Sequence, residues 1–360
     1  MPKNKTYVPS LDGLRAIAVG FVVCIHAGAP GFVLGWLGVD IFFAISGFLI
    51  TTLLIKEYEK TDTVNVAKFW GRRFLRLMPA YWLYVASMTI WMWSGSDTLQ
   101  THGGWSPFRY TLSLWFYFNN YAPMGGIWEH QLMTVQLWSL AIEEQFYFFW
   151  PFIFFISIKR KRLPLVIFVL LIFVIIYRLL FASHFDLLNT LYARGICIFA
   201  GCGTAILFVQ YPSVVRLFTH KAFLTAQLVF CAAICLICTA LIYDNIITED
   251  HVLYYVLPFL AFLFALFTAS LWYGKPGFLS KCFSLPPLVY IGRISYGIYL
   301  YHLVANKLTW EIFLNKDIFG NQYLDYALRF SFYLLLSIGI ASLSYHYYER
   351  WFLKLKDKLR

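Results

Sequence analysis

Long apolar segments that recur along the whole chain constrain its fold more than any other feature. Ten of them follow one another, at 14–34, 37–56, 79–94, 133–158, 163–183, 189–209, 222–243, 252–273, 288–307 and 326–348. A helix of about 20 apolar residues crosses the roughly 30 Å hydrocarbon core of a bilayer, and only the third segment is short. The sequence therefore predicts an all-α, polytopic membrane helix bundle of about ten transmembrane helices.

The composition also places the chain in a lipid bilayer. Of the 360 residues, 60% are hydrophobic and only 13% are charged, whereas a soluble domain is about half apolar and a quarter charged. We expect no cleavable signal peptide and no soluble appendage, so residues 1–360 are predicted to form a single integral-membrane domain.

The positions of the basic residues predict the orientation of the bundle. Of the 29 lysines and arginines, only three (Arg109, Lys307 and Lys316) fall in loops opposite the termini. Five lie within spans or at their edges, and the others share the side of the termini; the five are Arg15, Arg178, Arg194, Arg293 and Arg329. Because cytoplasmic loops collect lysine and arginine, both termini are predicted to be cytoplasmic. The net charge of +11 thus reports topology, and no nucleic-acid partner is expected.

The segment 108–127 is ambiguous. If it were a full span, everything after it would be inverted and the basic run Lys159–Arg162 would lie outside. We therefore expect a partly inserted or interfacial helix within an external loop at 95–132.

The seven cysteines lie within or beside apolar segments and predict no disulfide framework. Cys231, Cys235 and Cys238 share a helix face, but no histidine or acid joins them at ligand spacing, so we expect packing and no metal.

Arg15 and His26 are the first ionisable residues at membrane depth. Their separation of 11 residues leaves only about 20° of offset, so they share one helix face about 16 Å apart along the axis. Arg15 is expected at the cytoplasmic edge and His26 deep in the bundle, where ionisable groups usually serve function. A snorkelling arginine and a hydrogen-bonded core histidine are the alternative interpretation.

Glu143 and Glu144 interrupt an otherwise apolar span. The expected depths of Glu143 and His26 in the core nearly coincide, and a carboxylate that met His26 would orient its imidazole and hold its proton. Alternatively, the glutamate is structural and pairs with an intramembrane arginine such as Arg178 or Arg194.

A basic cluster, Arg72, Arg73 and Arg76, precedes Pro79 on the predicted cytoplasmic side. Arg73 and Arg76 are adjacent on a helix surface and suit bidentate phosphate binding, although a positive-inside anchor is the simpler interpretation.

Other polar residues in the spans are interpreted mainly as packing or bundle contacts. The Ser46-Gly47 pair permits close helix approach or a local break. Asp40 is expected to cap or to bond another helix. Arg293 is read as a bundle contact, and Ser295 and His302 also as candidate cavity residues.

Together these segments resemble the acyltransferase-3 family of membrane O-acyltransferases. The resemblance rests on five blocks in family order: Pro9–Val19 with the Arg15-to-His26 spacing, Gly38–Leu49, Arg72–Pro79, Trp138–Tyr147 and the Ile294-Ser-Tyr stretch. The late segment ending at His302 departs from the family pattern because it lacks the usual tryptophan.

This resemblance implies the stand-alone form, without a C-terminal hydrolase-like domain, in a bacterial inner membrane. It implies acetyl-coenzyme A, or another acyl-coenzyme A, as cytoplasmic donor. The implied acceptor is a cell-surface glycan, such as lipopolysaccharide or another polysaccharide, or a lipid-linked sugar. By residue, it points to Arg15, His26, Glu143, Arg73, Arg76, Ser46 and Gly47. We predict that Arg15, His26 and Glu143 serve catalysis and that the donor is bound by Arg72, Arg73, Arg76, Ser46 and Gly47.

We therefore predict an O-acyltransferase in which His26 is the general base, with a transient acyl-histidine as a variant. The competing function is a transporter of an anionic or sugar substrate, for which inverted repeats are typical but are not seen in the sequence. A catalytically silent interaction protein does not explain so many buried ionisable groups.

Overall fold

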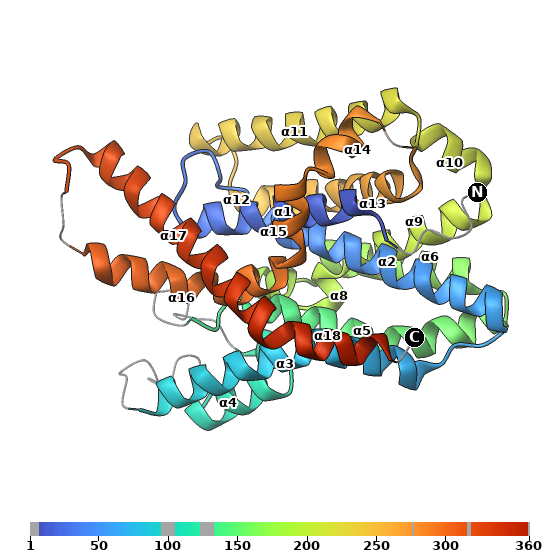
Figure 1. Cartoon of the computed structure of the whole chain (residues 1–360). Coiled ribbons are helices and arrows are strands. Elements are labelled where there is room, and N and C mark those ends of the chain that lie inside the picture. The colour runs from blue at the N-terminus through green and yellow to red at the C-terminus, as the bar shows by residue number, and fades with distance from the viewer. Residues whose placement is uncertain (1–6, 95–104, 123–132, 276, 315–317, 359–360) are drawn as a thin grey trace. The chain divides into compact units, whose positions relative to one another are not determined.

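The computed structural model describes residues 7–94, 105–122, 133–275, 277–314 and 318–358, and among these residues there is no β-strand (Figure 1). Each of the ten expected segments overlaps a long helix. These helices are α1 (Pro9–His26), α2 (Leu37–Thr61), α3 (Val66–Trp93), α5 (Leu137–Lys159), α6 (Leu163–Leu180), α9 (Ile196–Gln210), α11 (Lys221–Tyr243), α13 (Leu257–Tyr273), α16 (Ser295–Phe313) and α17 (Gln322–Ser344). Helix α3 begins well before its segment.

Short helices and helical turns connect the long ones. They are α4 (Pro107–Trp115), η2 (Asn119–Tyr121), α7 (His184–Asn189), α8 (Leu191–Arg194), α10 (Pro212–Phe218), α12 (Glu249–His251), η3 (Val252–Val256), α14 (Phe278–Phe283), α15 (Pro286–Arg293), η4 (Tyr345–Glu349) and α18 (Arg350–Asp357).

The all-α membrane architecture is confirmed. Within the described part of the chain, six helices are long and apolar enough to cross a membrane, or seven if the bent pair α9 and α10 forms one span. The total of ten spans and the cytoplasmic termini stay predictions. Of the predicted external loop at 95–132, only residues 105–122 are described; Lys3, Lys5 and Lys316, which entered the topology argument, also lie outside the described residues.

The described part of the ambiguous segment contains the nine-residue helix α4, followed by the turn η2. Nine residues rise about 14 Å, which is half of a hydrocarbon core. Ser106 caps its first turn by accepting a hydrogen bond from the Arg109 amide at 3.3 Å. Helix α4 is therefore too short to be a span, as the charge distribution requires.

The first helix begins and ends earlier than the apolar pattern predicts. It starts at Pro9, where the absent amide hydrogen is not needed. It ends at His26 because Gly28 adopts a left-handed φ of 64° and the Ala29 amide bonds back to the Cys24 carbonyl at 3.0 Å. The helix thus runs from Pro9 to His26, whereas the apolar pattern indicated about 14–34, and His26 is the last residue of α1.

The chain divides into two compact units. Unit 1 comprises residues 1–25, 29–64 and 146–293, and unit 2 comprises 26–28, 65–145 and 294–360. The prediction of one domain over 1–360 is not tested by this division.

The core of unit 1 is built on α2. Helices α2 and α9 approach so closely that a side chain at Gly47 would meet the Ile198 carbonyl oxygen at 1.9 Å, and one at Gly201 would meet the Ala44 carbonyl oxygen at 2.4 Å. Helix α13 packs on both. In the most apolar 18-residue stretch of each helix, 78% of the residues of α2 are buried inside the protein, but only 11% of those of α11. Helix α11 therefore presents its apolar surface to lipid.

Unit 2 is built from α3, α4, the first turns of α5, and the C-terminal helices. Helix α16 packs along α17, and α18 packs on α3 (Figure 1). Helix α4 lies against α3, where Tyr81 stacks on Tyr117 with ring centroids 4.1 Å apart and donates to the Leu114 carbonyl at 2.8 Å. These contacts hold together the helices of unit 2 that carry the candidate site residues.

Candidate functional site

His26 meets a second histidine inside unit 2. Its ring lies edge-to-face against the ring of His302 in α16, with centroids 4.8 Å apart and planes at 69°. The backbone of the same residue is anchored one turn further along α16, because Asn306 Nδ2 donates to the His26 carbonyl at 2.6 Å. His26 is exposed within the protein, which corrects the expectation that it lies deep in the bundle, and its imidazole is accessible to a substrate.

His302 is completely buried, and its two ring nitrogens differ in their surroundings. Nδ1 bonds the Tyr299 carbonyl at 2.7 Å, whereas Nε2 has no hydrogen-bond partner among the residues that the structure describes. Because a carbonyl oxygen can only accept, Nδ1 carries the proton, and Nε2 of the neutral ring presents a lone pair. A buried acceptor without a donor destabilises the folded protein, so the lack of a donor at Nε2 requires a physical reason.

Tyr299 connects this histidine to the beginning of α5. Its hydroxyl lies 2.6 Å from Ser139 Oγ and donates to the Gln136 carbonyl at 3.0 Å. The Gln136 amide in turn donates to the Leu300 carbonyl at 2.9 Å and to the Tyr84 hydroxyl at 3.0 Å. Buried bonds of this kind hold α16 and α5 in one register.

Glu143 follows one turn after Ser139 on the same helix and belongs to the same unit. Arg178 and Arg194, the intramembrane arginines of the alternative interpretation, are in unit 1. Arg194 makes a buried bidentate pair with Asp40, at 3.0 and 2.7 Å. The interhelical bond expected of Asp40 is therefore confirmed, and both interpretations of Glu143 stay predictions.

The basic cluster of α3 lies near carboxylates of unit 2. Arg73 interacts electrostatically with Glu144, and Arg76 interacts with Glu349 of η4. The guanidinium of Arg73 also lies over the Phe69 ring, 5.8 Å from its centroid. Arg72, Arg73 and Arg76 are all partly exposed. The cluster therefore presents positive charge on a surface that an anionic ligand can reach.

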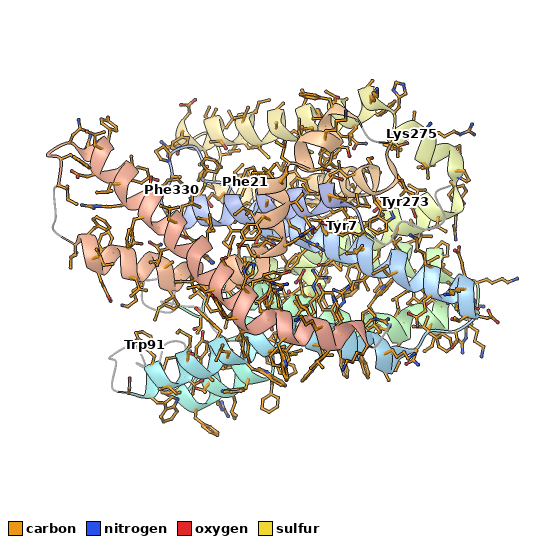
Figure 2. The ribbon with its side chains drawn as sticks, in the orientation of Figure 1. Tyr7, Phe21, Trp91, Tyr273, Lys275 and Phe330 are labelled. Atoms are coloured by element: carbon orange, nitrogen blue, oxygen red, sulfur yellow. The ribbon has the colours of Figure 1, made fainter. Side chains whose placement is uncertain are left out.

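Arg15 belongs to a separate polar cluster in unit 1. It pairs with Asp12 at 2.9 Å. The hydroxyl of Tyr7, a residue that Figure 2 labels, donates to the same carboxylate at 2.8 Å. Arg293 donates to the Tyr7 hydroxyl at 3.1 Å and lies 4.0 Å from Asp12. Asp12 lies in the first turn of α1.

Ser46 and Gly47 also lie in unit 1. Ser46 Oγ accepts from the Tyr147 hydroxyl at 2.9 Å. Gly47 faces the Ile198 carbonyl, so it permits the close helix approach that the sequence suggested. Contact of these two residues with the donor stays a prediction.

The structure therefore brings together His26, Glu143, Arg72, Arg73 and Arg76 in one compact unit and places Arg15, Ser46 and Gly47 in the other. Sequence reasoning left the role of His302 open, because no spacing rule connects α1 with α16. The available signal was local: His302 and Asn306 are four residues apart and share a helix face.

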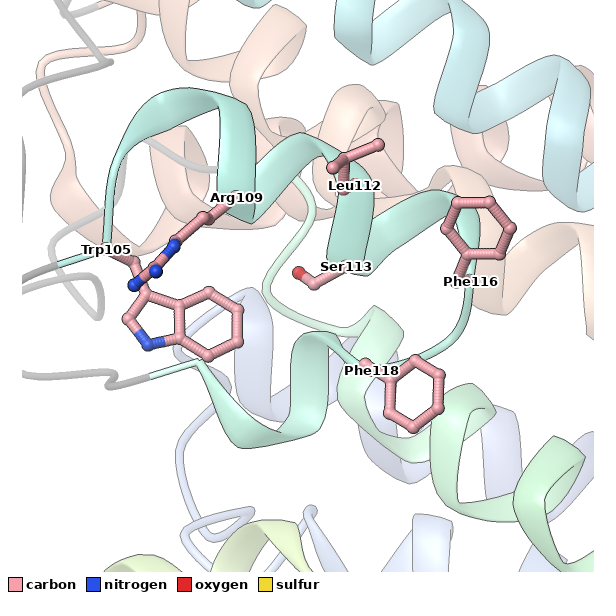
Figure 3. Close-up of a pocket in the computed structure, with 6 residues that line it drawn as sticks. All are labelled: Trp105, Arg109, Leu112, Ser113, Phe116 and Phe118. Atoms are coloured by element: carbon pink, nitrogen blue, oxygen red, sulfur yellow. The ribbon is translucent and has the colours of Figure 1, made fainter.

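The described residues also form an open hollow away from these side chains. It has a volume of about 450 Å³ and is lined by Trp105, Arg109, Leu112, Ser113, Phe116 and Phe118 (Figure 3). Phe116 and Phe118 are more than half exposed, as aromatic residues at a membrane interface are. The hollow contains none of the predicted site residues. Among the residues described, no group of three or more histidine, cysteine or acidic side chains is arranged to hold a metal ion.

Comparison with known proteins identifies the class of this chain. The family model for the acyltransferase-3 acyltransferase domain matches residues 8–346. The chain is 32% identical over 322 residues to the peptidoglycan O-acetyltransferase OatA of Listeria monocytogenes, covering 86% of this chain and 51% of that protein. It is 29% identical over 366 residues to the putative peptidoglycan O-acetyltransferase YrhL of Bacillus subtilis, covering 97% and 55%. The chain spans about half the length of these relatives. No solved structure matches it.

Proposed function

This chain belongs to the acyltransferase-3 family of membrane O-acyltransferases, and we propose that it moves an acetyl group from cytoplasmic acetyl-coenzyme A to a carbohydrate hydroxyl at the cell surface. The relatives named as peptidoglycan O-acetyltransferases support a glycan acceptor, either in the cell wall or as its lipid-linked precursor. The apolar helices support a multi-pass protein, which we place in the bacterial inner membrane.

The observation that carries this proposal is the accessible imidazole of His26 in the same unit as the basic cluster of α3. We assign the phosphates of coenzyme A to Arg73 and Arg76, with Arg72 beside them, because guanidinium groups bind phosphate oxygens in a bidentate manner. Arg15, Ser46 and Gly47 are proposed to contact the remainder of the donor.

In the proposed reaction, a ring nitrogen of His26 takes the proton of the acceptor hydroxyl. The hydroxyl oxygen then attacks the thioester carbon, so that a carbon–oxygen bond forms and the carbon–sulfur bond breaks. The leaving thiolate of coenzyme A takes the proton from the imidazolium of His26, which restores the base. We propose that Glu143 stabilises the positive charge that His26 carries in between.

A direct test uses purified protein in lipid nanodiscs with radiolabelled acetyl-coenzyme A and a soluble peptidoglycan fragment as acceptor. We expect acetyl transfer by the wild type. His26→Gln keeps a hydrogen-bonding side chain but no basic nitrogen, so transfer should fall by about 10²–10⁴ while coenzyme A affinity is kept. Near-normal transfer by folded His26→Gln protein would rule out this residue as the base. Acetyl-coenzyme A consumption without glycan acetylation would reject the acceptor class.

A further inference from the structure

We propose that His302 positions His26 for catalysis by accepting a hydrogen bond from its imidazole through Nε2. This inference rests on the proposed function, and it assigns a task to a residue for which neither the family match nor the sequence motifs provide one. His302 is a positioning residue, because it acts on the acceptor hydroxyl only through His26.

The His302 ring has its proton on Nδ1, as this hydrogen bond requires. The bond from Nδ1 to the Tyr299 carbonyl keeps the proton on Nδ1, so the lone pair of Nε2 is available. This nitrogen is fully buried and has no partner in the structure. A buried acceptor without a donor is destabilising, and its persistence at a candidate site indicates a role in some step of the reaction.

The ring of His302 also lies next to the imidazole that would donate this bond. The imidazole of His26 is in edge-to-face contact with it, at a centroid distance of 4.8 Å. A hydrogen bond between two imidazoles needs nitrogens about 3 Å apart, and this requires centroids about 5 Å apart. The observed spacing of the rings therefore agrees with a bond from a His26 N–H to Nε2 of His302, formed when the exposed His26 ring rotates about its last side-chain bond.

His26 and His302 are each held in place independently of the other. Asn306 bonds the carbonyl of His26 and fixes the end of α1 against α16. Tyr299 holds His302 by its carbonyl and the start of α5 by its hydroxyl. A catalytic base whose neighbour is fixed in this way loses little entropy when it reaches the reactive orientation.

The chemical consequence is a defined tautomer of His26. When one ring nitrogen donates to His302, the other must be unprotonated, and it is the one directed at the acceptor hydroxyl. After His26 takes the hydroxyl proton, its imidazolium still donates to Nε2 of His302, and this bond is stronger because the donor is charged. The proton then leaves to the thiolate of coenzyme A, and His302 is unchanged.

Two variants of His302 separate this role from a structural one. The amide of His302→Asn reaches the position of Nδ1 and keeps the bond to the Tyr299 carbonyl, but it places nothing at Nε2. The longer side chain of His302→Gln places an acceptor oxygen near Nε2. We expect His302→Asn to lower kcat by about 10- to 150-fold, which is the usual effect of losing a hydrogen bond to a charged group, with KM for both substrates unchanged. His302→Gln should keep more of kcat than His302→Asn.

The same acetyl-transfer assay measures both variants, with coenzyme A affinity and thermal unfolding as controls. Wild-type kcat in His302→Asn, equal losses in the two variants, or a loss confined to KM would each overturn the inference. If His302→Asn does not fold, His302→Gln decides alone: a kcat above a tenth of the wild-type value supports the role, and a fall to the level of His26→Gln overturns it. Failure of the wild type to transfer acetyl would instead reject the proposed function.

Discussion

At the scale of single residues, the basic cluster of α3 allows the sharpest test of donor binding. Arg73 and Arg76 are partly exposed, so an anionic ligand can reach them, and each has a carboxylate of unit 2 nearby. Replacing either with alanine should weaken coenzyme A binding by about 10- to 150-fold, the equivalent of about 1.5–3 kcal/mol. Lysine should restore only part of the affinity, because it cannot bind phosphate in a bidentate manner.

Calorimetric titration of the protein in nanodiscs with coenzyme A measures this effect. Arg109→Ala serves as the matched control, since Arg109 lines the hollow beside α4 and has no predicted role with the donor. Unchanged affinity in the folded double variant of Arg73 and Arg76 would assign the cluster to membrane topology alone.

At the scale of helices, the close approach of α2 and α9 makes Gly47 a packing residue. A Cβ at this position would lie 1.9 Å from the Ile198 carbonyl oxygen, and backbone cannot yield as a flexible side chain does. Gly47→Ala should therefore destabilise the protein by about 1–3 kcal/mol. Gly20→Ala in α1 is the control, because a Cβ there meets nothing within 4 Å and helical glycine costs about 1 kcal/mol relative to alanine.

Thermal unfolding in detergent should thus show a lower midpoint for Gly47→Ala and an equal or higher one for Gly20→Ala. Coenzyme A affinity, measured on the same samples below the midpoint, reports whether Gly47 also contacts the donor. A midpoint of Gly47→Ala equal to that of the wild type would contradict the observed helix contact.

At the scale of the whole molecule, the asymmetric distribution of lysine and arginine predicts the orientation in the membrane. Single cysteines introduced into a cysteine-free variant at Lys161 and near Trp105 should respond oppositely to a membrane-impermeant thiol reagent in intact cells. The position near Trp105 should react, and position 161 should react only after the membrane is opened. Labelling of position 161 from outside would overturn both the ten-span topology and the cytoplasmic location of the termini.

The sequence alone determined the class of fold and the position of nearly every long helix, because about 20 consecutive apolar residues have few other stable arrangements in lipid. Each of the ten segments overlaps a long helix, and the charge argument against a span at 108–127 agrees with the nine-residue α4. Motif spacing likewise singled out His26, Glu143, Arg73 and Arg76, which share one compact unit.

Only the tertiary structure decided where these side chains point and what they contact. Apolar periodicity extends through the turn after α1, so it could not show that Gly28 ends this helix and leaves the His26 imidazole exposed. The partner of His26 comes from α16, 276 positions later in the numbering of the chain, and the pair of Asp40 comes from α8. Hydrophobic pattern is a local property of the chain, whereas a buried polar contact depends on which helices pack together and at what register.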